Sequence, residues 1–342
     1  MDAAVGESQV KASEGLETAS AKPQDALAQL LSGEMAAVNA LIRARMASEH
    51  APRIPEVTAH LVEAGGKRLR PMLTLAAARL CGYQGEAHVV LATAVEFIHT
   101  ATLLHDDVVD ESEQRRGRPT ANLLWDNKSS VLTGDYLFAR SFQLMVETGS
   151  MRVLDILANA SATIAEGEVL QLTAAQSLRT DEDIYLKVIR GKTAALFAAA
   201  CEAGAVVAGA PEEQVLALKA YGDALGIAFQ MADDLLDYAG TEAVGKNRGD
   251  DFRERKVTLP VIRAAAAGER AFWERVIEDG DQQEGDFETA LGLMQSSGAL
   301  QSSAATALDW AAQARAALAP LPEGEIKTLL SGIADYVVHR IS

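Results

Sequence analysis

The chain has 342 residues, of which 49% are hydrophobic and only 5% aromatic, and its formal net charge is −17. This length allows one large domain or two ordinary ones, and a core made of Ala, Leu, Val and Ile suits packed helices. The negative charge argues against binding to nucleic acid and against electrostatic docking on anionic lipid. Only Cys81 and Cys201 are present, which indicates free thiols in a reducing compartment, so we expect a cytoplasmic protein.

Residues 1–26 are rich in Ala, Ser, Glu and Gln and show no hydrophobic periodicity. We predict a disordered acidic tail there, followed by a single all-α domain over residues 27–342. The tail resembles neither a secretory signal nor an Arg-rich transit peptide. The longest apolar stretch, residues 193–210, is interrupted by Glu202 and consists mainly of Ala and Gly. This composition predicts a packed core helix and no stable membrane insertion.

Helical spacing of apolar residues runs from residue 26 to residue 47, and two prolines then interrupt it. A second helix is expected to end at Gly65-Gly66, a typical C-terminal signal. The basic segment Lys67-Arg68-Leu69-Arg70-Pro71 leads into a helix over residues 72–81. Its charges and the backbone N–H groups of the new helix suit a diphosphate. The alternative is a basic turn that complements the helix dipole.

Two acidic motifs dominate the next part of the chain. Asp106-Asp107-x-x-Asp110 ends a long apolar helix expected over residues 86–109, and Asp233-Asp234-x-x-Asp237 lies in a second helix over residues 215–238. On a helix, the first and last Asp share one face, where like charges destabilise by about 0.2–0.5 kcal/mol per pair. A single copy would suggest a solvated acidic face. Two copies in apolar surroundings indicate a cation, and oxygen ligands favour Mg²⁺.

Basic residues lie near both motifs in the sequence. Arg115 and Arg116 follow the first motif in a polar loop over residues 111–120, and Lys192 lies within Gly191-Lys192-Thr193 in an apolar helix. Lys246 and Lys256 belong to a Gly- and charge-rich loop over residues 240–260, which is typical of a lid. Ordinary charged loops and a Lys whose ammonium reaches out to solvent are the alternatives. Together these residues could bind two polyanions, one through metals and one directly.

The remaining segment, residues 261–342, is expected to be helical with turns near residues 280–285 and 320–324, and we find no chemistry in it. The sequence contains no strand series, internal repeat or Gly-rich nucleotide motif. We therefore predict an all-α bundle of roughly ten or more helices around a central cavity, with the two acidic motifs facing each other across it.

The chain resembles the trans-prenyl diphosphate synthases (polyprenyl synthetases) from about residue 30 to its C-terminus. The resemblance rests on motifs that occur in the family's order: Gly65-Gly66-Lys67-Arg68-Leu69-Arg70-Pro71, His99, the two acidic motifs, Arg115-Arg116-Gly117, Gly191-Lys192-Thr193, Phe229-Gln230 and Lys256-Val257-Thr258-Leu259-Pro260. It implies an isoprenoid-synthase-type fold and the head-to-tail condensation of isopentenyl diphosphate onto an allylic diphosphate.

The resemblance also implies roles for individual residues. Those expected to hold Mg²⁺ on the allylic diphosphate, about two or three ions in all, are Asp106, Asp110 and Asp233, with Asp237 in support. Those expected to contact the same diphosphate are Arg115, Lys192 and Lys256, with Lys246 nearby, and catalysis should depend on Arg115 and Lys192 together with the first three Asp residues. Those expected to bind isopentenyl diphosphate are Lys67, Arg70, His99 and Arg116. Thr193 and Gln230 would line the reacting centre.

Product length is predicted from the residues before the first motif. Thr102, Ala101 and Ile98 lie one to two turns before Asp106 and should floor a tunnel for the prenyl tail. Short-chain members of the family have aromatic side chains near the first two positions, whereas here both are small. We therefore predict a long product, of the octaprenyl to decaprenyl class found as quinone side chains. The alternative is that Ala101 only packs helices and that Phe138, Phe142 or Met145 blocks the tunnel.

Other functions remain open at this stage. A terpene cyclase would carry a different second metal motif, and a non-catalytic partner subunit would tend to lose both acidic motifs. A shorter-chain farnesyl or geranylgeranyl diphosphate synthase is a further alternative. The resemblance favours a homodimer, although the sequence alone identifies no interface.

Overall fold

The computed structural model describes residues 22–63, 65–239 and 248–340. Most of the predicted tail and Lys246 lie outside the described residues. The first helix begins with a proline, whose fixed φ suits a first helical turn, and it starts at Pro23. Residues 23–26 are therefore helical, and the predicted boundary of the tail lies a few residues too late.

Helices account for most of the described residues. In the first half of the chain they are α1 (Pro23–Leu30), α2 (Ser32–Met46), α3 (Arg53–Glu63), α4 (Leu69–Leu80), α5 (Ala87–Val109), α6 (Ala121–Leu124), α7 (Asn127–Glu147) and α8 (Met151–Ala174). A two-stranded antiparallel hairpin, β1 (Gln114–Arg115) with β2 (Arg118–Pro119), follows α5. The loop predicted after the first acidic motif thus contains a short hairpin.

In the second half the helices are α9 (Glu182–Ile189), the π-helix η1 (Arg190–Ala194), α10 (Ala195–Val207), α11 (Glu212–Ala239), α12 (Asp250–Arg253), α13 (Leu259–Ala267), α14 (Arg270–Trp273), the π-helix η3 (Glu274–Glu278), α15 (Asp286–Ser296), α16 (Ala299–Ala317) and α17 (Glu325–His339). The turns predicted near residues 280–285 and 320–324 fall between helices, as expected. The all-α fold is confirmed.

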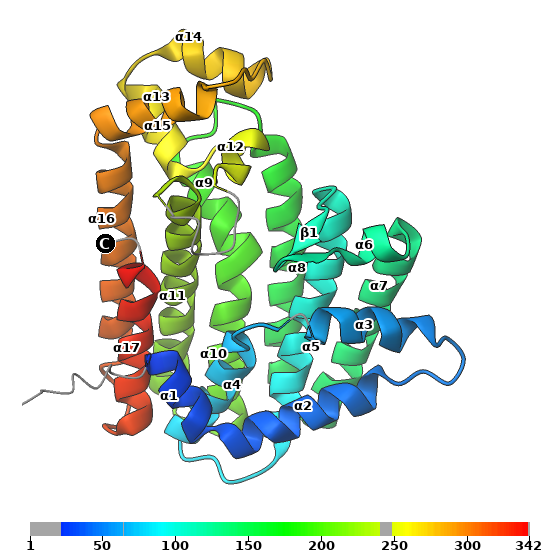
Figure 1. Ribbon diagram of the computed structural model, residues 1–342. Helices are drawn as coiled ribbons and strands as arrows, with labels where there is room; N and C mark the ends of the chain where they lie inside the picture. The colour runs from blue at the N-terminus through cyan, green and yellow to red at the C-terminus, as the bar shows by residue number, and fades with distance from the viewer. Residues whose placement is uncertain (1–21, 64, 240–247, 341–342) are drawn as a thin grey trace, which may run out of the picture.

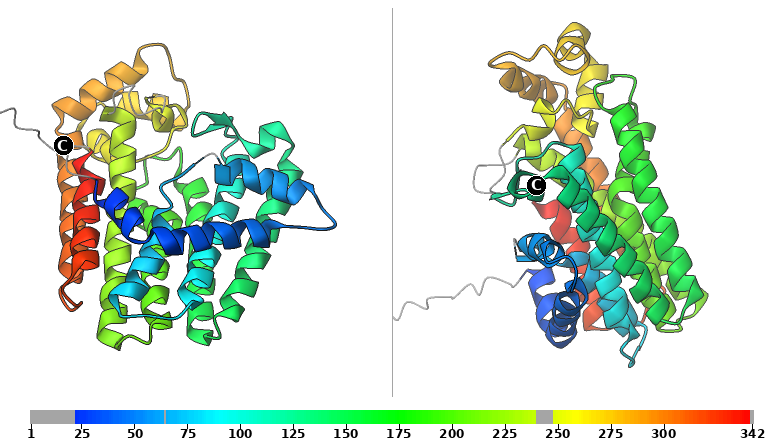
Figure 2. Two further views of the ribbon diagram at one scale, coloured as in Figure 1. Left: turned by 60° about the horizontal axis from the view of Figure 1, so that its bottom comes forward. Right: turned by 90° about the vertical axis from the view of Figure 1, so that its right-hand side faces the viewer.

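The long helices form a bundle in which α10 occupies the interior. Helix α10 packs against α4, α8 and α11, while α5 packs against α7 and α4. Helices α1 to α3 cross one face of the bundle, and α13 to α15 cover one end (Figures 1 and 2). Because the acidic motifs lie toward the C-terminal ends of α5 and α11, both face the same end of the bundle (Figure 1).

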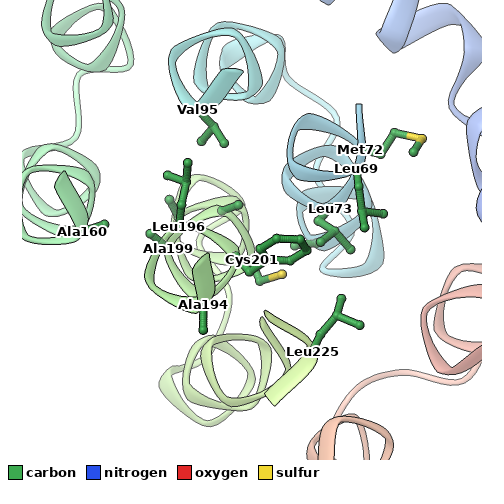
Figure 3. Packing of buried hydrophobic residues seen from close by; sticks show 14 of the residues in the cluster. Leu69, Met72, Leu73, Val95, Ala160, Ala194, Leu196, Ala199, Cys201 and Leu225 are labelled. Carbon is green, nitrogen blue, oxygen red and sulfur yellow. The ribbon is translucent and has the colours of Figure 1, made fainter. Parts of the chain in front are cut away.

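Small side chains allow this close packing. Side chains from α4, α5, α8, α10 and α11 meet around α10, with few aromatic rings among them (Figure 3). A Cβ atom at Gly204 of α10 would lie 2.5 Å from the carbonyl oxygen of Thr74 on α4, so the backbones of these two helices are nearly in contact. The core is thus built mainly from side chains such as Ala, Leu and Val, as the sequence predicts.

Helix α5 is also the helix of the described residues that is long and apolar enough to span a membrane. Two thirds of its most apolar window is buried inside the protein, and α2, α4 and α7 pack against it. The stretch predicted as a core helix, residues 193–210, corresponds mainly to α10, whose residues from Leu196 to Ala205 are buried. Both helices are core elements of the bundle.

Candidate active site

A large cleft opens beside the C-terminal ends of α5 and α11. Its volume is about 1830 Å³, including space that is open to solvent. The residues predicted for the site that line it are Arg70, His99, Thr102, Asp106, Asp110, Arg115, Arg116, Lys192, Thr193, Gln230, Asp233, Asp237 and Lys256. The two acidic motifs therefore share one cleft, as predicted, and the basic residues lie around them.

In the first motif, each Asp has different surroundings. Burial raises the pKa of Asp106, the Lys192 ammonium lowers it, and the carboxylates of Glu168 and Asp110 raise it, which leaves a net pKa of about 7. Asp107 is buried and accepts hydrogen bonds from Arg115, with its Oδ1 atom 2.8 Å from Nε and 2.7 Å from Nη2. Asp110 follows the last residue of α5 and lines the cleft. The motif thus combines an ion pair with two carboxylates that face the cleft.

The second motif lies inside α11 and is held by neutral groups. Asp234 accepts hydrogen bonds from the Tyr185 hydroxyl at 2.7 Å and from the Gln230 amide at 2.8 Å. Asp237 accepts from the backbone N–H groups of Asp250 and Asp251, each at 3.1 Å. Burial, followed by the Asp251 carboxylate, raises the pKa of both Asp234 and Asp237 to about 7.

Lys192 reaches the cleft from a local distortion of its helix. It belongs to the π-helix η1, a form that is frequent at functional sites. A Cβ atom at Gly191 would lie 2.8 Å from the Cα atom of Gly167 on α8, so glycines permit the close approach of the two backbones. Across this contact the Lys192 ammonium pairs with Glu168 at 3.0 Å.

The next residue joins this region to the second motif. The Thr193 hydroxyl donates a hydrogen bond of 2.7 Å to the side-chain oxygen of Gln230, whose amide nitrogen binds Asp234. Lys256 pairs with Asp251 at 3.3 Å and with Glu254 at 2.5 Å. Burial alone would lower the pKa of Lys256, but these two carboxylates raise it above its ordinary value. Three cations of the cleft, Arg115, Lys192 and Lys256, are thus paired with carboxylates.

A second, more basic pocket adjoins the cleft. Its volume is about 1120 Å³, and the two cavities share Arg70, His99, Leu103, Arg116, Phe229 and Asp233. The predicted Lys67 lines this pocket, together with Arg68 and Arg340. The guanidinium of Arg70 lies 4.5 Å above the Phe197 ring, and its Nη1 atom is 3.3 Å from the Nε2 atom of His99.

The electrostatics of this pocket suit an anion. Burial lowers the pKa of Arg70, the Glu96 carboxylate raises it and neighbouring Arg116 lowers it, which leaves a net pKa of about 10. Burial and the adjacent guanidinium groups also hold the pKa of His99 well below its ordinary value, so His99 is neutral at pH 7. Closely spaced, desolvated cations are a binding site for a polyanion such as a diphosphate.

Several residues that are candidates for a functional role were not identified from the sequence. Glu168, Tyr185, Asp251 and Arg340 each line a cavity of the site or contact a residue that does. For Glu168, the acidic residues Glu166 and Glu168 are visible in the sequence of α8, but nothing in their spacing indicates Lys192 as a partner. Arg340 lies near the C-terminus, in the segment for which we expected no chemistry, and only the folded chain brings it to Lys67.

The predicted tunnel residues occupy different environments. Thr102 lines the cleft, whereas Ile98, Ala101 and Met145 are buried in the core. Phe142 is 37% exposed on the outer side of α7 and contacts Phe138, with ring centroids 5.7 Å apart. The role of these residues in setting product length stays a prediction.

Comparison with known proteins identifies the family. The polyprenyl synthetase family matches residues 51–294, which is more than half of the chain, so the chain belongs to this family. Octaprenyl diphosphate synthase of Escherichia coli (strain K12) is 45% identical over 316 residues, which cover 91% of this chain and 97% of that protein. All-trans-nonaprenyl-diphosphate synthase (geranyl-diphosphate specific) of Rhodobacter capsulatus is 42% identical over 323 residues, which cover 93% of this chain and 98% of that protein.

Comparison with solved structures also gives prenyl diphosphate synthases. The crystal structure of a decaprenyl diphosphate synthase from Rhodobacter capsulatus is 71% identical and has a TM-score of 0.91, with 94% of this chain and 100% of that chain covered. That of a polyprenyl synthase from Caulobacter crescentus CB15, complexed with calcium and isoprenyl diphosphate, is 53% identical with a TM-score of 0.89, covering 93% of this chain and 98% of that chain. The predicted class of enzyme, a long-chain prenyl diphosphate synthase and hence a prenyltransferase, is confirmed.

Proposed function

We propose that this enzyme condenses isopentenyl diphosphate with an allylic diphosphate and repeats the step until the product reaches the octaprenyl to decaprenyl range. The observation that carries the proposal is the pair of adjoining cavities. One contains both acidic motifs and the other is basic, and they meet at Arg70, His99 and Phe229. Two diphosphates bound in them would bring their prenyl groups together at this junction.

The acidic cleft fits Mg²⁺ in the chemistry of its donors. Asp106, Asp110 and Asp233 offer carboxylate oxygens to one cleft. Among the described residues, no three His, Cys, Asp or Glu side chains form a ready-made metal cage. Mg²⁺ commonly binds through one or two carboxylates and substrate phosphates, so the allylic diphosphate would complete its coordination. When bound, Mg²⁺ would supply neutralisation of the charge that develops on the departing diphosphate.

The side chains of the cleft would contribute in three ways. Arg115, Lys192 and Lys256 would bind the allylic diphosphate and favour its departure by offsetting negative charge. Lys67, Arg70 and Arg116 would hold isopentenyl diphosphate in the basic pocket, with the neutral His99 beside it. Apolar groups such as Phe229 and Leu103 would keep water from the electron-deficient allylic carbon. The leaving diphosphate is the expected acceptor of the proton lost in the last step.

The activity is tested by incubating the purified chain with Mg²⁺, farnesyl diphosphate and isopentenyl diphosphate, followed by mass analysis of the products. Octaprenyl to decaprenyl products support the proposal. Products that end at the geranylgeranyl stage would identify a shorter-chain enzyme, and absence of turnover would favour a non-catalytic partner subunit.

The tunnel hypothesis is tested by Ala101→Tyr. Because Ala101 is completely buried near Asp106, an added phenol ring should obstruct the prenyl tail and shorten the product by several isoprene units. Ala312→Tyr, on the exposed side of α16, is the matched control and should leave product length unchanged. Unaltered products from a folded Ala101→Tyr variant would contradict the tunnel.

A cytoplasmic homodimer completes the proposal. Helices α7 and α8 lie along one side of the bundle (Figure 2) and expose Leu132, Val146, Val169 and Leu172, each at least 60% accessible. Exposed apolar side chains gathered on neighbouring helices are typical of an interface. A second copy of the chain would cover them. Leu132→Glu should convert a dimer to a monomer in sedimentation analysis, and a wild-type monomer would contradict the proposal.

A further inference from the structure

One buried carboxylate lies among the cations of the basic pocket. Glu96 is on α5, one turn before His99, and its carboxylate forms an ion pair with the Arg68 guanidinium. Arg68 also donates a hydrogen bond of 3.3 Å to the carbonyl oxygen of Val62. Both charged side chains are mostly buried, so the ion pair is little screened by solvent. Among the described residues that line this pocket, the acidic ones are Glu96 and Asp233.

The backbone at Arg68 is strained. Its φ is +47°, in the left-handed region that residues with a side chain rarely adopt, and it forms the N-cap of α4. Such a conformation costs about 1–3 kcal/mol and persists only where the surroundings enforce it. The contacts of the Arg68 side chain with Glu96 and Val62 provide that enforcement. This turn sets the directions in which Lys67 and Arg70, on either side, leave the backbone.

Glu96 also acts on the neighbouring cations. Its negative charge favours the charged forms of Arg70 and Arg116. It thereby offsets the cost of burying Arg70 and the repulsion between Arg70 and Arg116. A Cβ atom at Gly66 would lie 2.7 Å from Arg116 Nη1, so the turn and this guanidinium are already in close contact. Without the Glu96 carboxylate inside the cluster, the cations of the pocket would repel one another and lose their arrangement.

We propose that Glu96 is a positioning residue for the basic pocket: by pairing with Arg68, it fixes the turn that carries Lys67 and Arg70 toward the bound diphosphate. Arg68 is then a structural cation, whereas Lys67, Arg70 and Arg116 are the diphosphate ligands. This inference rests on the proposed function, in which the basic pocket binds isopentenyl diphosphate. It assigns different roles to the basic residues of one short segment.

The test compares Michaelis constants for the two substrates in Glu96→Gln. Glutamine keeps the size of the side chain but removes the charge that holds Arg68. The KM for isopentenyl diphosphate should rise on the order of tenfold or more, because small misplacements of binding groups are costly. The KM for the allylic diphosphate should change less than twofold. Glu212→Gln removes one member of an exposed Arg–Glu pair elsewhere, Arg152–Glu212, and should alter neither constant.

A double-mutant cycle distinguishes positioning from general destabilisation. Arg68→Gln leaves the Glu96 carboxylate buried without its ion pair, so it should raise the same KM at least as much as Glu96→Gln. If both residues act through one contact, the double variant should be no worse than the poorer single variant. Strictly additive effects, or a common loss of kcat and of affinity for both substrates, would overturn the proposal.

Lys67→Gln separates this inference from the proposed function. If it raises the KM for isopentenyl diphosphate while Glu96→Gln does not, the pocket assignment is right and the positioning role is wrong. If Lys67→Gln and Glu96→Gln instead raise the KM for the allylic diphosphate, the pocket assignment itself is wrong.

Discussion

The acidic motif on α5 and the acidic motif on α11 face the same cleft but are held in it differently. On α5, the middle carboxylate pairs with Arg115, which is itself a predicted diphosphate ligand. On α11, the middle carboxylate binds the hydroxyl of Tyr185 and the amide of Gln230, both neutral. The α5 motif is therefore coupled to a charged side chain of the cleft, whereas the α11 motif is held by hydrogen bonds from neutral groups.

The last carboxylate of each motif extends the comparison. Asp110 follows the final residue of α5 and lines the cleft, while Asp237 receives two backbone N–H groups from the start of α12. Asp237 thereby attaches the segment that carries Lys256 to the core of the bundle. Repetition of a sequence motif does not make its members equivalent: the α11 copy supports the fold, and we expect the α5 copy to act mainly on the substrate.

The largest effect should come from Asp106→Ala. This side chain lies in the cleft near Lys192, where a metal and the allylic diphosphate would meet, so kcat/KM should fall by about 10³. Because burial makes the ionised form of Asp106 unfavourable, its removal should not lower the melting temperature. Steady-state kinetics and thermal denaturation measure the two quantities. A fall of kcat/KM by less than tenfold would contradict a role of the α5 motif in the reaction.

The middle carboxylates provide the sharpest contrast. Asp107→Asn removes the charge that holds Arg115, so kcat/KM should fall by about 10², as it should in Arg115→Gln. Asp234→Asn keeps an oxygen that can accept from Tyr185 or Gln230, so its loss should stay within about tenfold.

The Asp107→Asn/Arg115→Gln double variant is the control for this contrast. If Asp107 acts by holding Arg115, the double variant should be no less active than either single one. Equal losses of kcat/KM in Asp107→Asn and Asp234→Asn would contradict this prediction. They would show that the two middle carboxylates contribute equally to activity although their partners differ.

Local patterns predicted the helices and the acidic motifs well. Apolar spacing placed a helix over residues 86–109, and α5 runs from Ala87 to Val109. The Asp spacing was enough to infer one shared cleft. The Pro23 start of α1 was also readable from the sequence, because proline favours the first turn of a helix, but the low periodicity nearby concealed it.

The remaining features depend on contacts between distant residues. Arg68 and Glu96 are 28 residues apart, and Arg340 reaches the basic pocket from the far end of the chain. The approach of Gly191 to Gly167, which places Lys192, requires two helices to pack with almost no intervening side chain. No spacing rule within one helix predicts such pairs, since their geometry is set by how the helices pack.

The last carboxylates should affect activity less than Asp106 or Asp107, and here the two motifs are expected to differ in kind. Asp110→Asn should lower kcat/KM by about tenfold, raise the Mg²⁺ concentration needed for half-maximal rate, and leave the melting temperature unchanged. Asp237→Asn should lower activity only a few-fold. It turns an amide N–H toward a backbone N–H of α12, so the free energy of unfolding should fall by about 1–3 kcal/mol.

Magnesium titrations and thermal denaturation of both variants therefore test the division of roles. Asp110→Asn and Asp237→Asn make the same chemical change at the same position of each motif, so each is the control for the other. If Asp237→Asn raises the Mg²⁺ requirement as much as Asp110→Asn and does not destabilise the fold, Asp237 is a metal ligand of equal rank. The hydrogen bonds from the backbone N–H groups of α12 to the Asp237 carboxylate would then weaken when the metal binds. In that case the α11 motif would take part in substrate binding as fully as the α5 motif.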